Sequence, residues 1–233
     1  MNPDHSSVSV ILPVLNGERY LASAIESVQN QSLPPEEILV VDGNSDDRSR
    51  EIAESSALVR LLTQDGKGLS NAWNYGIRQA AGDLIAFIES DDLWVEDKLS
   101  QQIEHMKASP STDYVIGRVH FFLEKGNQIP TGFKPELLEG DYIGRIPGTL
   151  MARKSLFDDV GLFDESLKIA ADVDWFARCK DLGSSGHILG KVLLEKRVHS
   201  DNLSNNAARN TNELLSLLRR SIERQRNTDN GGS

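Results

Sequence analysis

The chain has 233 residues, of which 39% are hydrophobic and 26% charged, with a formal net charge of −10 and a pI near 5.0. A chain of this size and composition buries one sizeable core and is not disordered as a whole. The acidic balance argues against a nucleic-acid-binding surface, so we expect no nucleic acid among its partners.

Cys179 is the single cysteine, which excludes an internal disulfide and is typical of a protein in the reducing cytosol. We interpret it as a small core residue rather than a nucleophile. No stretch approaches the roughly 18 apolar residues of a membrane span. The first residues lack the basic region of a signal peptide, and Pro13 interrupts their apolar run. We therefore expect a cytoplasmic protein.

The first half of the chain alternates β-branched apolar runs with segments of helical periodicity. Strands are predicted at residues 8–14, 36–43, 58–62 and 84–88, and helices at residues 19–31, 46–56, 69–82 and 95–108. Apolar strands without internal alternation, separated by helices, predict an α/β fold with a mostly parallel, doubly wound sheet.

The second half is less regular, but no linker divides it from the first. A strand is predicted at residues 114–122, a loop at 124–148, a helix at 172–183, a strand at 187–200 and an amphipathic helix at 205–226. Residues 227–233 are predicted to form a flexible tail. We therefore expect a single domain over residues 1–204, followed by the C-terminal helix.

Three carboxylates follow the strand predicted at residues 84–88, where Glu89, Asp91 and Asp92 stand with no Lys or Arg beside them. Like charges repel, and each costs free energy to desolvate, so we expect at this site a positive charge that this sequence does not supply. Asp42 ends the second strand. Ligands of parallel sheets bind outside the carboxyl ends of the strands, so these acids should meet in one crevice.

An acidic cluster of this kind is a metal site, a proton-transfer pair or a solvated turn. Its hard oxygen ligands suit Mg²⁺ or Mn²⁺, whereas zinc is disfavoured because no Cys or His stands near it in sequence. The turn "LNGERY" has one glycine, so there is no dinucleotide fingerprint, and no P-loop occurs. A nucleotide phosphate bound here without a glycine cradle or a lysine would need a divalent cation.

Three segments carry a resemblance to a known family. They are "VSVILPVLNGERYLASAIESVQNQS", "EEILVVDGNSDDRS" and "GLSNAWNYGIRQAAGDLIAFIESDDLW". They are similar to the opening strand and helix, the second strand, and the helix leading to the DxD-type motif of GT-A-fold, inverting glycosyltransferases of family 2. The resemblance extends from residue 8 to about residue 204. It implies a nucleotide-sugar-binding half at residues 1–108 and an acceptor and catalytic half at residues 109–204.

The resemblance also implies roles for residues at the nucleotide site. Pro13, Val14 and Asp42 would line the pocket for the base and ribose. Asp91 and Asp92 would hold the ribose, a Mn²⁺ or Mg²⁺ ion and, through it, the diphosphate.

Two later segments resemble the catalytic parts of the family. "AADVDWFARC" resembles the stretch that supplies the general base, which places Asp172 in that role and leaves Asp174 structural. "KRVHSDNLS" resembles the segment whose histidine, here His199, binds metal or diphosphate. Trp175 is adjacent to the expected base and is a candidate to stack on an acceptor sugar.

The chain departs from the family pattern at four positions. Glu89 stands where Asp is more frequent, Gly43 where many members have a second acid, Trp73 where Arg is frequent and Ala171 where Glu is frequent. These changes bear on the metal role of Glu89, on base recognition and on the grip on the donor.

The resemblance predicts metal-dependent, inverting transfer of a sugar from a nucleotide-sugar donor to an acceptor hydroxyl. We expect uridine rather than thymidine in the donor, and a sugar or lipid-linked sugar as the acceptor, in bacterial polysaccharide or glycolipid synthesis. Two alternatives stay open: a nucleotide-sugar-binding module without transferase activity, and a nucleotide-sugar pyrophosphorylase, which should carry a basic, Gly-rich loop after the first strand.

The C-terminal helix adds a further hypothesis. Residues 207–226 contain five Arg and two Glu. The helix either docks on the core with its arginines in water or is a weak anchor to anionic lipid at the inner face of the membrane.

Overall fold

The computed structural model describes residues 7–200 and residue 202. The first half of the chain contains β1 (Val8–Val14), α1 (Leu21–Gln29), β2 (Glu37–Asp42), α2 (Ser49–Glu54), β3 (Val59–Thr63), α3 (Leu69–Gln79) and β4 (Leu84–Phe87). The second half contains β5 (Leu93–Trp94), α4 (Lys98–Ala108), β6 (Tyr114–Phe122), η1 (Pro135–Glu139), β7 (Asp141–Ile143), η2 (Pro147–Thr149), β8 (Met151–Arg153), α5 (Leu156–Val160), α6 (Ala171–Asp181) and β9 (Gly186–Arg197).

The strands and helices predicted within residues 8–200 are present, and their ends shift by a few residues. The helix predicted to end at Gly82 ends at Gln79, and the helix predicted from Val95 begins at Lys98. The predicted helix at 205–226, its proposed membrane contact and the predicted tail lie outside the described residues. Within the described part of the chain, no helix is both long and apolar enough to span a membrane.

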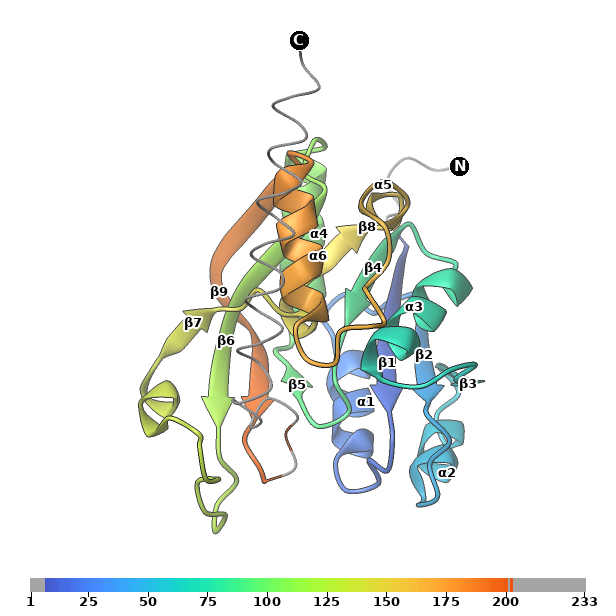
Figure 1. The fold of residues 1–233 in the computed structure, drawn as a ribbon, viewed down its shortest axis with the longest axis vertical. Helices are drawn as coiled ribbons and strands as arrows, with labels where there is room; N and C mark the ends of the chain where they lie inside the picture. The colour runs from blue at the N-terminus through green and yellow to red at the C-terminus, as the bar shows by residue number, and fades with distance from the viewer. Residues whose placement is uncertain (1–6, 201, 203–233) are drawn as a thin grey trace.

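Within residues 7–200, one sheet of nine strands organises the domain, in the order β3-β2-β1-β4-β8-β6-β9-β5, with β7 on β6 (Figure 1). The parallel pairing predicted for the first half is confirmed by β1 with β2, β1 with β4 and β2 with β3. In the second half, β8 pairs antiparallel with both β4 and β6, and β5 pairs antiparallel with β9. The fold is therefore a single mixed α/β domain.

Helices cover both faces of the sheet. Successive side chains of a strand point to opposite faces, so the fully buried strand β1 contributes to a core on each face. Ile11 lies on one face, in a core shared with residues of α3, α5 and α6. Leu12 lies on the other face, in a core shared with residues of α1, α2 and α4. This covering leaves the strand ends as the exposed edge at which a polar site can form.

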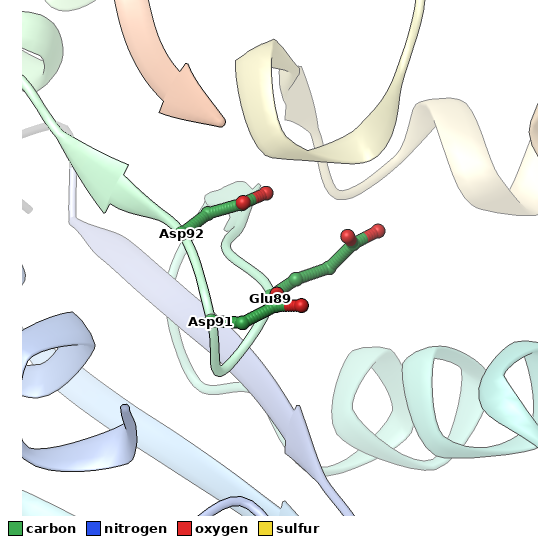
Figure 2. A group of neighbouring side chains, drawn as sticks. All are labelled: Glu89, Asp91 and Asp92. Carbon is green, nitrogen blue, oxygen red and sulfur yellow. The ribbon is translucent and has the colours of Figure 1, made fainter. Parts of the chain in front are cut away.

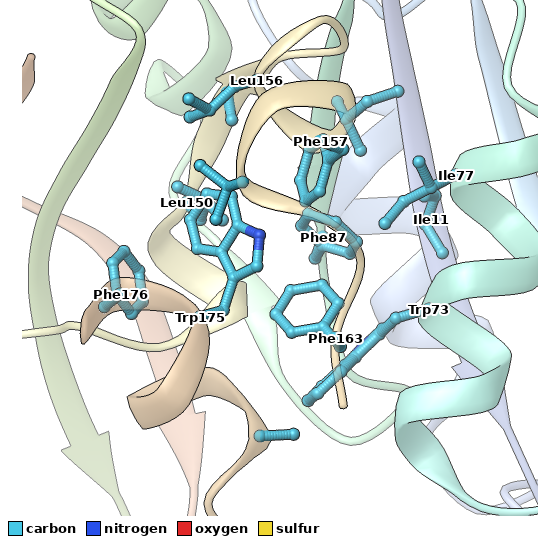
Figure 3. Packing of buried hydrophobic residues seen from close by; sticks show 14 of the residues in the cluster. Ile11, Trp73, Ile77, Phe87, Leu150, Leu156, Phe157, Phe163, Trp175 and Phe176 are labelled. Atoms are coloured by element: carbon cyan, nitrogen blue, oxygen red, sulfur yellow. The ribbon is translucent and has the colours of Figure 1, made fainter. Parts of the chain in front are cut away.

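An aromatic cluster fills the first of these cores (Figure 3). Trp175 is fully buried and stacks on Phe157 with ring centroids 5.0 Å apart, and it lies 5.7 Å from Phe163. The expectation that Trp175 stacks on an acceptor sugar is therefore wrong. Cys179 is buried in the same core, and burial raises the pKa of its thiol to about 12. This position agrees with a core cysteine and makes the thiol a poor nucleophile.

Candidate active site

The acidic cluster lies at the carboxyl end of β4, beside the end of β1. Phe87 is paired with Ile11, and the amide of Ile88 donates to the carbonyl of Ile11 at 3.1 Å. The chain then leaves the sheet in a turn that carries the three acids. Carboxylate oxygens of Glu89, Asp91 and Asp92 lie within 4.8 Å of one another, and the side chains extend to the same side of the turn (Figure 2).

The C-terminal end of β9 brings basic groups to these acids. Lys196 donates from Nζ to Glu89 at 2.7 Å and to Asp92 at 2.8 Å. His199 lies just after β9, and its Nε2 is 2.8 Å from Oδ2 of Asp91. The expectation that this chain supplies no positive charge here is wrong, because it considered only neighbours in sequence, and Lys196 is 104 residues from Asp92.

Burial and these contacts separate the pKa values of the two aspartates. Burial raises the pKa of Asp92 to about 7; Glu89 and Asp91 add to this rise, and the charge of Lys196 opposes it. Burial also raises the pKa of Asp91, but the hydrogen bond with His199 and the charge of Lys196 outweigh it, so the net shift is downward. Of the two aspartates, Asp91 is therefore the one that stays ionised more readily.

The donor set fits a hard divalent cation. Carboxylate oxygens are the ligands that Mg²⁺ and Mn²⁺ prefer, and an imidazole is also compatible with Mn²⁺. Asn202 helps to position two of these ligands, because its Nδ2 donates to Asp91 at 3.2 Å and its Oδ1 accepts the amide of His199 at 2.7 Å. The argument against zinc from sequence neighbours does not hold, since His199 is adjacent, but three carboxylates still favour a harder ion.

Arg197 fixes the segment that carries Lys196 and His199. Its guanidinium lies between the rings of Tyr20, at 4.4 Å, and Phe122, at 4.8 Å. Its Nε donates to the carbonyl of Asp91 at 2.8 Å, and its backbone amide donates to Asp92 at 3.0 Å. Arg197 was not among the residues predicted for the site, although it lies in the segment "KRVHSDNLS"; the two cationic residues before His199 were the available signal.

The residues expected at the nucleotide base lie at neighbouring strand ends. Val14 is paired with Asp42 across β1 and β2. Asp42 is fully buried, and its carboxylate accepts from Nη1 of Arg50 at 2.6 Å and from the amide of Ser45 at 3.1 Å. Pro13 and Val14 are buried as well. Asp42 and the acidic cluster thus lie at the ends of the two strands that flank β1, and their meeting in one crevice stays a prediction.

Hydrogen bonds tie the loop after β1 to the loop after β2. The amide of Asn16 donates to Ser45 at 2.9 Å, and Oδ1 of Asn16 accepts the amide of Asp46 at 2.9 Å. Asn16 adopts a φ of 53°, a left-handed conformation that Asn tolerates. At Gly17 an added Cβ would lie 2.7 Å from a methyl of Val14, so the turn needs glycine there. These contacts fix both loops around the strand ends.

Asp172 lies in the first turn of α6, with a partly exposed side chain. Burial raises the pKa of its carboxyl to about 6; the charge of Glu89 raises it further, and that of Lys196 lowers it. Asp172 is therefore close enough to the acidic cluster to feel its charges. Asp174 is buried and accepts from Nε of Arg178 at 2.7 Å, which agrees with the structural role expected for it.

Two of the departures from the family pattern, Trp73 and Gly43, lie in different surroundings. Trp73 is buried against Phe163, with ring centroids 5.0 Å apart, so its indole belongs to the aromatic core. At Gly43 an added Cβ would lie 3.1 Å from Oε1 of Gln64 and 3.4 Å from the carbonyl of Val14, so a larger residue there would crowd both.

Solved structures of glycosyltransferases share this architecture. Staphylococcus aureus TarS, residues 1–349, determined in complex with UDP-GlcNAc, superposes with a TM-score of 0.68 at 21% identity, over 84% of this chain and 60% of that one. Mycobacterium tuberculosis glucosyl-3-phosphoglycerate synthase, in complex with Mn²⁺, UDP and phosphoglyceric acid, gives 0.68 at 19% identity, over 93% and 78%. The fold is that of the GT-A glycosyltransferases.

Sequence comparison identifies the family. The profile of glycosyl transferase family 2 matches residues 9–161, and an uncharacterized glycosyltransferase of Rickettsia typhi is 30% identical over 223 residues, covering 90% of this chain and 70% of that protein. The chain belongs to glycosyl transferase family 2. It spans 38% of a similar Rickettsia conorii glycosyltransferase, to which it is 29% identical over 238 residues covering 94% of this chain.

Proposed function

We propose that this chain transfers a sugar from a UDP-sugar to an acceptor hydroxyl, with inversion at the anomeric carbon and with the help of Mn²⁺ or Mg²⁺. The observation that carries the proposal is that the Asp172 carboxyl feels the charges of Glu89 and Lys196, two side chains of the group that also includes Asp91, Asp92 and His199. A carboxylate with a pKa of about 6 is an effective base near neutral pH, and the acidic cluster beside it suits the diphosphate's counter-ion.

The proposed roles divide between the two sides of the site. Pro13, Val14 and Asp42 border the base and ribose, and Asp42 also holds Arg50. Asp91, Asp92 and His199 hold the cation, which when bound neutralises charge on the leaving diphosphate.

Asp172 supplies the catalytic step on the side of the acceptor. It accepts the proton of the acceptor hydroxyl as that oxygen forms its bond to the anomeric carbon, while the bond from that carbon to the diphosphate oxygen breaks. A single displacement of this kind inverts the configuration. The acceptor is proposed to be a sugar or a lipid-linked sugar in bacterial polysaccharide or glycolipid synthesis.

Similar proteins support the choice of donor. TarS has been determined with UDP and with UDP-GlcNAc. Escherichia coli WfgD, named a UDP-Glc:alpha-D-GlcNAc-diphosphoundecaprenol beta-1,3-glucosyltransferase, is 39% identical over 106 residues, covering 44% of this chain and 42% of WfgD. A UDP-sugar is therefore the first donor class to test.

The test is a thermal-shift screen of UDP- and dTDP-sugars with Mn²⁺, followed by assays of nucleotide release with candidate acceptors. A ligand at one hundred times its Kd stabilises the fold by about 2.7 kcal/mol. Release of UDP that requires both acceptor and Mn²⁺ would support the transferase. Binding without turnover would favour the binding module, and formation of nucleotide-sugar from sugar phosphate and UTP would favour the pyrophosphorylase.

A further inference from the structure

Lys196 occupies an unusual position for a lysine, between two acids of the cluster. Its Nζ bonds to both Glu89 and Asp92, and the three side chains are 14%, 29% and 1% exposed, respectively. The ammonium is thus held in the space that these two carboxylates would offer a cation. The Asp91 carboxylate has other partners, the Nε2 of His199 at 2.8 Å and the Nδ2 of Asn202 at 3.2 Å.

We propose that Lys196 is a built-in counter-ion that competes with the divalent cation for Glu89 and Asp92 and moves to the donor's diphosphate when both ligands bind. This proposal rests on the proposed function. It assigns to Lys196 a positioning role that makes the binding of metal and of nucleotide cooperative.

The ammonium of Lys196 and a divalent cation in the same cluster repel each other. A cation held by Asp92 and Asp91 would stand next to the ammonium, because the carboxylate oxygens of the cluster lie within 4.8 Å of one another. Like charges at such separations repel strongly where water is scarce. Lys196 must therefore leave at least one carboxylate when the cation enters, and metal alone binds at the expense of at least one of its two hydrogen bonds.

The displaced ammonium of Lys196 can move to the diphosphate of the donor. A lysine has a flexible four-carbon stem and three donors, and it binds phosphate as a point charge. Arg197, the next residue, is fixed between two aromatic rings and bonded to Asp91, so the backbone at Lys196 stays in place while the side chain swings. A nucleoside diphosphate next to the cation offers the displaced ammonium new oxygen partners.

Cooperative binding of the metal and the diphosphate follows from this repulsion and from the movement of the ammonium. Binding of the metal displaces the ammonium of Lys196, which can then bind the diphosphate. Binding of the diphosphate draws this ammonium away from the acids, so its positive charge no longer opposes the metal. By linkage, UDP should raise the affinity for Mn²⁺ by the same factor by which Mn²⁺ raises the affinity for UDP.

The experiment compares Lys196→Met with the matched control Lys191→Met, an exposed lysine on the same strand. Isothermal titration at pH 8 measures Mn²⁺ binding alone, UDP binding alone, and each in the presence of the other. We expect Lys196→Met to bind Mn²⁺ alone at least tenfold more tightly than the unaltered protein, and the mutual enhancement of Mn²⁺ and UDP to fall at least threefold. Lys191→Met should behave as the unaltered protein.

The outcomes separate this inference from the proposed function. Cooperative binding of Mn²⁺ and UDP by the unaltered protein, left unchanged in Lys196→Met, would overturn the role of Lys196 alone. Absence of Mn²⁺ binding in all three proteins would overturn both proposals. Lys196→Gln, which keeps a hydrogen-bond donor without the charge, is measured in parallel. Weaker Mn²⁺ binding by either folded Lys196 variant than by the unaltered protein would also overturn the proposed competition.

Discussion

Replacing Asp172 by Asn tests the proposed base, because Asn keeps the size of the side chain but does not accept the proton. General base catalysis contributes about 10²–10⁴-fold, so kcat should fall by that factor, which is about 2.7–5.5 kcal/mol of activation free energy. Donor binding should change little, since the lost interaction acts mainly in the transition state. The unaltered enzyme should gain activity as the pH rises through about 6, where Asp172 loses its proton.

The same substitution should stabilise the fold. A rise in pKa from 3.8 to about 6 means that the native state holds the proton of Asp172 more tightly than the unfolded chain. The sign of linkage is then a loss of stability as pH rises between these values, complete above about 6. After allowance for partial exposure, we expect Asp172→Asn to gain about 1–2 kcal/mol at pH 7.5.

Two assays check both effects. Product formation and anomeric configuration are followed by NMR, and unfolding is followed in urea at pH 4 and pH 7.5. Asp174→Asn is the comparison within the same helix, since its partner Arg178 gives it a structural role; it should destabilise the fold. Full activity of Asp172→Asn, or a product that retains the donor's configuration, would refute the reasoning.

Three further substitutions probe other parts of the structure. Asp92→Asn should weaken Mn²⁺-dependent UDP binding at least tenfold, about 1.4 kcal/mol, with an unchanged circular dichroism spectrum; unaltered affinity in a titration would remove Asp92 from the metal site. Lys98 is fully buried, 4.0 Å from the centre of the Trp94 ring, and burial holds its pKa well below 10.5. Because the unfolded chain binds that proton more tightly, stability at this site rises with pH up to about 10.5; Lys98→Met should flatten this pH dependence, and an unchanged dependence of unfolding in urea on pH would contradict this. Gly76→Ala would place a Cβ 2.5 Å from a methyl of Ile11, so it should cost about 1–3 kcal/mol; an unchanged unfolding midpoint would show that the core yields.

Much of the nucleotide half was predictable because its signals are local. Each apolar strand of β1, β2 and β4 has a length and a β-branched composition that identify it alone, and acids at strand ends are visible without a structure. The resemblance supplied Asp172 and His199, and the structure brings both into the neighbourhood of the cluster. Their catalytic and metal-binding roles stay predictions.

The remaining features depend on contacts between residues far apart in the chain. Lys196 reaches Glu89 over 107 residues, and no periodicity or spacing encodes such a pair. The short strands β5 and β8 have two and three residues, too few for an alternating pattern to be read. Arg50 stands in an apparently ordinary helix, and only the fold shows that it binds Asp42.

The position of β9 in the sheet links the completion of folding to the completion of the site. Among the strands within residues 7–200, β9 comes last in the sequence, yet it is inserted between β6 and β5. β5 follows directly after the acids and pairs with β9. The C-terminal side of the turn that carries Glu89, Asp91 and Asp92 is therefore held in the sheet only after β9 has paired with β5. During synthesis, which proceeds from the N-terminus, the acids emerge about a hundred residues before Lys196 and His199. A nascent chain that has reached β5 therefore carries the acidic turn without Lys196 and His199, and the proposed site for metal and nucleotide is completed in the same late step that completes the sheet.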